Sequence, residues 1–366
     1  MIRRPPRSTQ SRSSAASDVY KRQDKYYVQH GGSPDGFTIE IVKKINGNPI
    51  TKETAMINFL ETHKDIPSEQ VAYFGDEFIQ NEYGEYNDWP IYASDHSLVK
   101  NIKIFAVNYT YHRLLEPPQD LINTANQPNS RVVYASQKYN LEGPQATFHI
   151  FQEILEPTSI FPTPTIPTAV FKAIVCDYDK TLNDRNNPLD NRPEWLNLII
   201  RLMKEKKARF VLMSGSKLEG QKKRLMAVVE QLKIELGIDD ISKATDEQRK
   251  QFKEILTYFG PCYGDGAASR YDLEIDDQGE LIWKVNKEYT EPHIIPDNEK
   301  DEIKQILKGI VDSYNQLSQQ DIDELMQKAR ITSLGGGPWS GIKPVSYTHL
   351  RAHETPEHLV CRLLLE

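Results

Sequence analysis

The chain of 366 residues has little of three things that often assign a protein to a class. No apolar run approaches the ~20 residues of a membrane-spanning helix, so the sequence predicts no membrane span. The 3 cysteines, Cys176, Cys262 and Cys361, give no disulfide framework and favour a reducing, cytoplasmic location. The net charge of −7 leaves no basic field, which makes nucleic acid and anionic membranes poor partners. With 38% hydrophobic and 27% charged residues, the composition is that of a soluble globular protein.

Both ends of the chain differ from the part between them. Residues 1–23 are basic, rich in serine and without apolar pattern, and residues 345–366 also break from the pattern that precedes them. Both stretches resemble translated sequencing-adapter or vector sequence, which is excluded from fold reasoning. For residues 1–23 a transit peptide is the alternative, because the stretch is rich in arginine and serine with one acidic residue, Asp18. We therefore expect two artefactual tails around a segment cut from a longer chain.

The stretch from Phe171 to Leu182 carries the strongest chemical pattern. Its short apolar run, Ala173 to Cys176, ends in Asp177, with Asp179 and Thr181 at alternate positions. Such a run predicts a strand buried on both faces, as in parallel sheets, where ligands bind beyond the carboxyl ends of the strands. There Asp177 can attack a phosphorus atom, Asp179 can move a proton, and Mg²⁺ can shield the charge. The alternative is that the two aspartates serve only a turn or a helix cap.

A second apolar strand is predicted further along, within the stretch Ala208 to Lys217. It ends at Ser214 and Gly215. A hydroxyl at a strand tip can donate a hydrogen bond to a phosphoryl oxygen, and glycine lets the backbone approach closely. Ser214 can also cap the helix that follows, and the two roles are compatible.

Together these two stretches resemble the first and second motifs of the haloacid dehalogenase (HAD) superfamily of phosphatases and phosphotransferases. The resemblance implies a Rossmann-like α/β core, Mg²⁺ as cofactor and an aspartyl-phosphate intermediate on Asp177. It also implies that Asp179 acts as acid and then as base, that Thr181 and Ser214 bind phosphoryl oxygens, and that Mg²⁺ contacts Asp177 and the carbonyl of Asp179. Lys180 departs from the family pattern, which usually has glycine there. Its side chain must point away from the phosphate or add a cation to it.

Residues that resemble the later motifs of the family come earlier in this chain. Lys52 opens a predicted helix over residues 51–63, for which Thr51 is a plausible cap. It looks like the lysine that steadies the aspartyl phosphate and the charge of the nucleophile. The match is incomplete, because Glu53 follows where the family usually has a small residue. An exposed helix lysine is the alternative.

A further stretch resembles the family's fourth motif. A short apolar run over residues 71–74 ends in Gly75-Asp76-Glu77, and Asn87-Asp88 follows. The spacing is similar to that of the eukaryotic phosphomannomutase and trehalose-phosphatase branches, with a few extra residues. The resemblance implies Mg²⁺ ligands here, and we expect Asp76 and Asp88, with Glu77 as third choice. The alternative is an acidic loop that stays hydrated.

These matches predict an α/β protein whose parts are out of the family's order. We expect the following segments: a tail at 1–23, the C-terminal half of a HAD core at 24–155, a Pro-rich linker at 156–167, the N-terminal half of a core at 168–262, part of an inserted α/β cap at 263–344, and a tail at 345–366. A tandem of two domains cut at both ends and a circular permutant both remain open. In either case we expect one composite sheet, with strands 71–74 and 102–107 beside strands 172–176 and 209–213.

Further elements follow from periodicity. A strand is predicted over residues 37–42, and a hairpin is predicted over residues 270–285 around Asp276-Asp277-Gln278-Gly279. The predicted helices cover residues 132–155 as one or two helices, 194–204, 222–238, 244–258 and 299–314.

The function expected from the resemblance is a Mg²⁺-dependent phosphomonoester hydrolase that acts on a small phosphorylated metabolite such as a sugar phosphate. The alternative is a catalytically inactive HAD-like binding or regulatory module, which Lys180 and the broken order favour. A third possibility is that the segment does not fold stably, because half-domains leave strand edges unpaired. No pattern identifies the substrate or the oligomeric state.

Overall fold

The computed structural model describes residues 25–33, 36–78, 80–81, 84–85, 88–107, 119–156, 171–183, 188–215, 222–276, 281–299, 301 and 349–352. Residues 50–293 form one compact unit, and the described residues outside that range belong to another. The expected segment boundaries near residues 156, 168 and 263 therefore all lie within the larger unit. The tail at 1–23, nearly all of the Pro-rich linker at 156–167 and most of the helix expected at 299–314 lie outside the described residues.

The smaller unit contains antiparallel strands. Its strands are β1 (Tyr26–Ser33), β2 (Gly36–Ile45), β3 (Asn48–Pro49) and β14 (His349–Ala352). Strand β2 pairs with each of the other three, which confirms the strand predicted over residues 37–42. Strand β14 lies within the C-terminal stretch that we expected to be artefactual, and it pairs with residues Phe37 to Glu40 of β2.

The larger unit is built on a mixed sheet. The strands are, in sheet order, β13 (Leu281–Val285), β12 (Ser269–Ile275), β11 (Phe259–Gly264), β10 (Arg209–Met213), β9 (Ala173–Cys176), β4 (Val71–Gly75), β7 (Lys103–Ala106) and β8 (Val132–Tyr134). The strands from β11 to β8 are parallel, whereas β12 pairs antiparallel with both β11 and β13. A separate short hairpin joins β5 (Gln80–Asn81) to β6 (Gly84–Glu85). The α/β class is confirmed, and the hairpin predicted over residues 270–285 is confirmed by β12 and β13.

The pairing of β4 with β9 joins the two halves of the chain. Val71 lies opposite Ala173 and Phe74 lies opposite Cys176, in parallel register. The predicted composite sheet is thus present, with β7 and β10 on the outer sides of this pair. The segment from residue 263 was expected to begin a cap, but β12 and β13, which lie within it, are strands of this same sheet.

One segment differs from its predicted structure. The sequence predicted only helices over residues 132–155, but Val132 to Tyr134 is the strand β8. Two β-branched residues and a tyrosine suit an extended strand whose valines are buried, and β8 pairs in parallel with β7. The three residues are too few to show a period of two, so the pattern did not distinguish them from the helices that follow.

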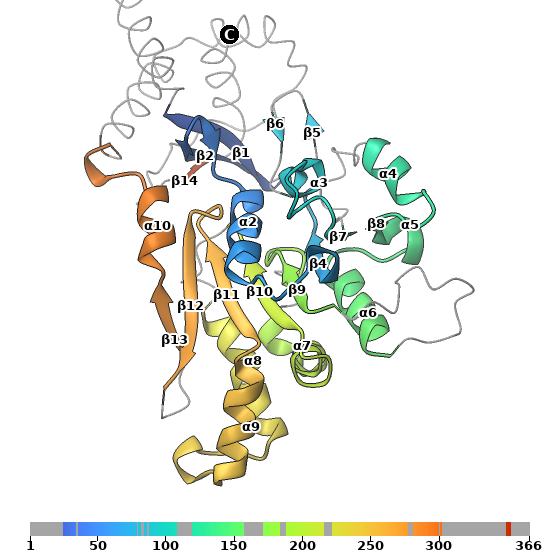
Figure 1. Cartoon of the computed structure of the whole chain (residues 1–366), viewed down its shortest axis with the longest axis vertical. Coiled ribbons are helices and arrows are strands. Elements are labelled where there is room, and N and C mark those ends of the chain that lie inside the picture. The colour runs from blue at the N-terminus through green and yellow to red at the C-terminus, as the bar shows by residue number, and fades with distance from the viewer. Residues whose placement is uncertain are drawn as a thin grey trace, which may run out of the picture. The chain divides into compact units, whose positions relative to one another are not determined.

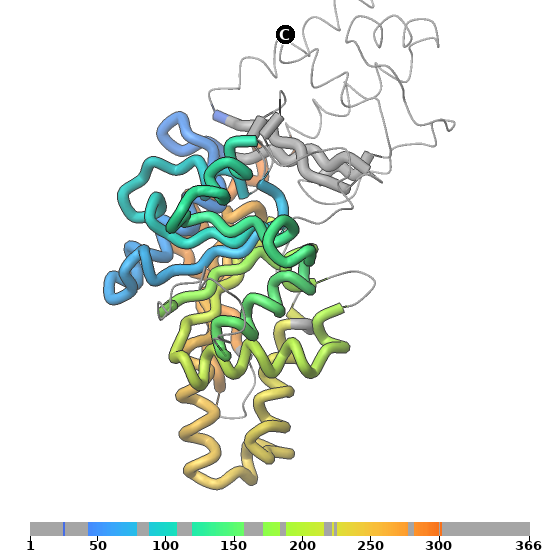
Figure 2. The backbone as a smooth tube through the Cα atoms, turned by 90° about the vertical axis from the view of Figure 1, so that its right-hand side faces the viewer, coloured from blue at the N-terminus to red at the C-terminus, as the bar shows by residue number. Residues whose placement is uncertain are grey.

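Helices cover both faces of the sheet, as Figures 1 and 2 show. The helices of this unit are α2 (Lys52–Thr62), α3 (Trp89–Ala93), α4 (Gln119–Ala125), α5 (Ala135–Tyr139), α6 (Gly143–Leu155), α7 (Pro193–Glu205), α8 (Lys222–Glu235), α9 (Asp246–Leu256) and α10 (Lys287–His293), with short 3-10 turns at Ser68–Gln70, Leu189–Asn191 and Ile241–Lys243. None of the described helices is both long and apolar enough to cross a membrane.

Two apolar clusters form the core, one on each face of the sheet. Along β9, Ala173 and Val175 belong to one cluster, and Ile174 and Cys176 belong to the other. This alternation is the period of two expected for a strand covered on both faces. The first cluster includes side chains from α2, α3 and α4, and the second includes side chains from α6, α7, α8 and α9. Each fully buried large apolar side chain contributes roughly 1.5–3 kcal/mol, so this core holds β4 and β9 rigidly in place.

Candidate functional site

The border between β4 and β9 is a topological switch point of the sheet. From β9 the chain continues outward to β10 and β11, and from β4 it continues outward in the opposite direction to β7 and β8. All of these strands are parallel, so their carboxyl ends lie along one edge. In open α/β sheets the crevice beyond that edge, at the point where the strand order reverses, is where ligands bind.

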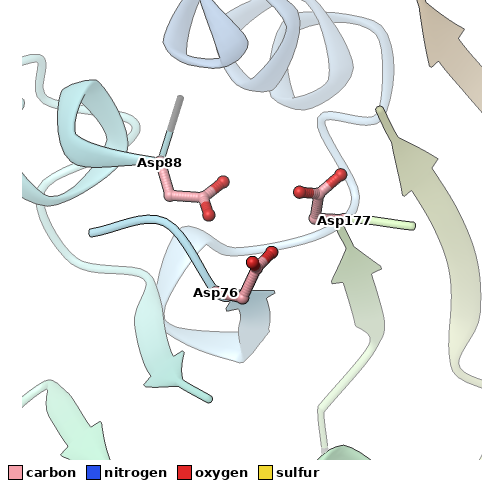
Figure 3. A group of neighbouring side chains, drawn as sticks. All are labelled: Asp76, Asp88 and Asp177. Atoms are coloured by element: carbon pink, nitrogen blue, oxygen red, sulfur yellow. The ribbon is translucent and has the colours of Figure 1, made fainter. Parts of the chain in front are cut away.

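Three buried aspartates meet at this border. Asp76 directly follows β4, Asp177 directly follows β9, and Asp88 is the N-cap of α3. One carboxylate oxygen from each lies within 4.8 Å of the others, and Figure 3 shows the three side chains pointing toward one another. The exposed fractions of Asp76, Asp88 and Asp177 are 2%, 0% and 4%. Three carboxylates out of water at this spacing can all stay ionised only with positive charge nearby.

Lys52 supplies one positive charge. It is the first residue of α2, and its ammonium Nζ lies 2.7 Å from Oδ1 of Asp88 and 2.8 Å from Oδ2 of Asp177. The side chain is 2% exposed, so it is not the exposed helix lysine that was the alternative. Burial lowers the pKa of Lys52, but the charges of Asp177 and Asp88 raise it by more, so the pKa of Lys52 lies above its ordinary value. Lys52 therefore stays charged and bridges two of the three carboxylates.

Asp88 is saturated with hydrogen bonds. Its Oδ1 accepts from Lys52 and from the hydroxyl of Tyr73, and its Oδ2 accepts from the backbone N–H of Glu77 at 2.8 Å. The phenol of Tyr73 is fully buried within β4. Because both oxygens of Asp88 are in use, this carboxylate is better suited to positioning Lys52 than to binding a further cation directly.

Asp76 has the opposite character. Its Oδ1 accepts a hydrogen bond from the Thr181 hydroxyl at 3.1 Å, but within the described part of the chain no donor reaches its Oδ2. Burial raises the pKa of Asp76 well above its usual range, and the neighbouring Glu77 adds to the rise, whereas Lys180 opposes it. A buried carboxylate oxygen without a partner costs free energy, and a cation would remove that cost.

Asp177 is held at both oxygens. Its Oδ1 accepts the backbone N–H of Tyr178 at 2.7 Å, and its Oδ2 pairs with Lys52. The pKa of Asp177 is raised to about 7, because burial and the charge of Asp88 raise it by more than Lys52 lowers it. Lys52 therefore favours the carboxylate form of Asp177 against the effects of burial and of the neighbouring Asp88.

The remaining predicted residues lie around this centre. Ser214 is buried at the end of β10, the strand next to β9, and its backbone N–H donates to the Tyr263 carbonyl at 2.9 Å. Asp179 is exposed and forms an isolated bridge with Asn183 in the turn after β9. The carboxylate of Glu77 lies 3.2 Å from Nζ of Lys180. Neither Asp179 nor Glu77 belongs to the group of three carboxylates.

The donor set fits a hard divalent cation. The three carboxylates carry three negative charges and Lys52 carries one positive charge, which leaves an excess of two if all three are ionised. Oxygen donors alone suit Mg²⁺, Ca²⁺ or Mn²⁺ rather than a metal that prefers sulfur or nitrogen. The Oδ2 of Asp76, to which none of the described residues donates a hydrogen bond, supplies a coordinating atom.

Sequence reasoning missed Tyr73. The residue lies inside an apolar strand, and by sequence alone it reads as one more core aromatic. A usable signal was present, because a buried tyrosine hydroxyl needs a hydrogen-bond partner. The identity of that partner, Asp88, depends on the loop between β4 and α3 and is not visible in any spacing.

Comparisons with protein-family models, with curated proteins and with solved structures give no match to this chain.

Proposed function

We propose that this chain is a phosphomonoester hydrolase of the HAD type that requires a divalent cation such as Mg²⁺. The observation that carries the proposal is the buried group of Asp76, Asp88 and Asp177, bridged by Lys52 at the switch point between β4 and β9. These are the residues that resemble the first, third and fourth motifs of the family. Their meeting from two distant parts of the chain supports the assignment more strongly than any single motif does.

In this proposal Asp177 is the nucleophile. Its carboxylate attacks the phosphorus atom in line and forms an aspartyl phosphate as the bond to the leaving alcohol breaks. Asp179 gives a proton to that alcohol and then takes one from the water that hydrolyses the intermediate, releasing phosphate and restoring Asp177. The exposed position of Asp179 beside the buried Asp177 suits a group that exchanges protons with solvent and substrate.

The other residues bind and orient. Lys52 favours the ionised form of Asp177 and offsets charge on the transferring group, and Asp88 and Tyr73 hold Lys52 in place. Thr181 and Ser214 are buried near the strand ends and are the proposed donors to phosphoryl oxygens, for which the Thr181 hydroxyl would exchange its hydrogen bond to Asp76. Asp177 and Asp76 would hold Mg²⁺. The resemblance implies that the backbone carbonyl of Asp179 would be a further ligand. When bound, the cation would neutralise phosphoryl charge.

A catalytically inactive binding module is the second candidate, and Lys180 is the observation that favours it. Its side chain occupies a place where the family usually has none, and it pairs with Glu77 beside the carboxylates. For the hydrolase, we propose a small phosphorylated substrate such as a sugar phosphate.

The test is hydrolysis of an aryl phosphate and of a panel of sugar phosphates by the full chain, with Mg²⁺ and with a chelator. We expect turnover that needs Mg²⁺ and that falls at least about 10³-fold in Asp177→Asn, because that variant lacks the nucleophile. Asp190→Asn, at a partly buried aspartate in a 3-10 turn, is the matched control and should retain activity. A folded protein that binds phosphate and Mg²⁺ without turnover would instead favour the binding module.

A further inference from the structure

Lys180 has an unusual backbone conformation in the turn after β9. Its φ is +61°, in the left-handed region that residues with a Cβ rarely adopt. The turn is closed by three backbone hydrogen bonds: Lys180 N–H to the Asn183 carbonyl at 2.7 Å, and the N–H groups of Leu182 and Asn183 to the Tyr178 carbonyl at 3.0 Å each. The surrounding structure therefore imposes this conformation and fixes where the Lys180 side chain begins.

The Lys180 side chain reaches back to the loop that follows β4. Its Nζ lies 3.2 Å from Oε1 of Glu77, the residue next to Asp76. The two side chains are 24% and 12% exposed, so the ion pair is only partly screened by water. The backbone N–H of Glu77 donates to Asp88, which ties this pair to the buried carboxylates.

The charge of Lys180 acts on the carboxylates themselves. Burial lowers the pKa of Lys180, but Glu77, then Asp76 and then Asp177 raise it, with a net rise. Asp76 is the carboxylate whose Oδ2 no described donor reaches. The positive charge of Lys180 thus acts on the Asp76 carboxylate, although Lys180 donates no hydrogen bond to its Oδ2.

We propose that Lys180 is a tethered cation that competes with the divalent cation for Asp76 and Asp177, and that Glu77 limits this competition by holding the ammonium to one side. The inference rests on the cation site of the proposed function and defines which residue sets its affinity. Removing the charge of Lys180 tightens divalent-cation binding, because the ammonium no longer repels the doubly charged ion. Removing the charge of Glu77 weakens binding, both directly and by releasing Lys180 toward Asp76.

The experiment measures Mn²⁺ binding to the full chain by electron paramagnetic resonance, without substrate, so it does not depend on turnover. We expect Lys180→Met to lower the Kd for Mn²⁺ about tenfold, and Lys180→Arg, which keeps the charge, to stay within about twofold of the wild type. Glu77→Gln raises the Kd, and it does so less in the Lys180→Met background than in the wild type, as a double-mutant cycle would reveal. If Lys180→Met is poorly folded, Lys180→Gly replaces it, because glycine adopts φ +61° without strain.

Lys172→Met is the matched control. Lys172 immediately precedes β9, at the other end of the strand from Asp177, is exposed and donates to the Asp65 carbonyl. It should leave the Kd unchanged. An unchanged or higher Kd in Lys180→Met, or an equal change in Lys172→Met, would overturn the inference. Absence of Mn²⁺ binding in every variant would overturn it together with the cation site. Tighter binding in Lys180→Met without hydrolysis by any variant would support the inference while the proposed function fails.

Discussion

Gly75, the last residue of β4, lies close against the Asp88 carboxylate. A Cβ added at Gly75 would lie 2.5 Å from both Cγ and Oδ2 of Asp88, which is closer than such atoms approach. Asp88 in turn fixes Lys52 at 2.7 Å. The absence of a side chain at one position therefore determines where the bridging ammonium lies relative to Asp177.

Gly75→Ala is expected to displace Asp88 and, through it, Lys52. Overpacking of this kind typically costs about 1–3 kcal/mol of unfolding free energy. We also expect turnover to fall at least about 10-fold, because Asp177 loses the ammonium that favours its ionised form. Urea unfolding and steady-state kinetics measure the two effects.

Gly237→Ala is the control for this change. Gly237 has φ +65° and only Gln248 Nε2, at 3.9 Å, near an added Cβ. The strained backbone costs about 1–2 kcal/mol, but the position follows α8 and is remote from the three aspartates in the fold. Equal loss of turnover in both variants would mean that Gly75 acts only through stability.

At the scale of elements, helix α2 connects the site to the surface. It runs from Lys52 to Thr62, and His63 follows as the C-cap, whose backbone N–H donates to the Phe59 carbonyl. The His63 ring is half-buried against the Phe59 ring, with 4.6 Å between centroids. Burial lowers the pKa of His63 and the charges of Arg209 and Arg270 lower it further, whereas its bond to the Phe59 carbonyl and the charge of Asp65 raise it.

This arrangement predicts a loss of stability in mild acid. The unfolded chain takes up a proton at His63 near its ordinary pKa of about 6.5, before the folded chain does. The unfolding free energy therefore falls as the pH drops from 7.5 toward 5.5, by less than about 1.4 kcal/mol per pH unit for this one group.

The measurement is urea unfolding of the wild type and of His63→Gln across that range. The stability of the wild type relative to His63→Gln should decrease with falling pH. His96→Gln, at an exposed histidine, is the matched control. A relative stability that is constant or rises with falling pH would contradict the assignment.

At the scale of the larger unit, the fold depends on a pairing between distant segments. Strands β4 and β9 are inner strands of the sheet and are buried along their length. Their backbone groups satisfy one another, so each segment without the other would leave a long unpaired edge and an exposed apolar face. This is the pairing that brings Asp76 to Asp177.

Residues 50–156 and 171–293, produced as separate chains, are expected not to fold alone. Mixed or co-expressed, they should give a cooperative unfolding transition and recover Mn²⁺ binding, because the pairing of β4 with β9 buries both edges. Circular dichroism against urea concentration measures this for each fragment and for the mixture.

A cut elsewhere provides the control. Strand β13 is an edge strand of the sheet, so residues 50–276, which lack β13 and the short helix α10, should still unfold cooperatively. Cooperative folding of residues 171–293 alone would mean that β9 does not need β4, and the composite sheet would then not be essential to the fold.

The sequence by itself determined the local features of this protein. Short apolar runs ending in Asp177 and in Gly75-Asp76 predicted buried parallel strands with carboxylates at their ends. The hairpin of β12 and β13 and most of the helices were likewise predicted, because hydrophobic periodicity and turn residues act over a few positions. The proximity of Lys52, Asp76 and Asp177 could be predicted only on the assumption that both segments contribute parallel strands to one sheet.

Only the tertiary structure decided which atoms touch. Tyr73 and Asp88 meet across a loop, Lys180 meets Glu77 across two strand ends, and β8 is a strand because β7 lies beside it. None of these contacts produces a periodic pattern in the sequence, because packing rather than regular spacing brings the residues together. The charge balance around Asp76 depends on these contacts. They also distinguish Asp88, which positions Lys52, from Asp76, whose Oδ2 is available to a cation.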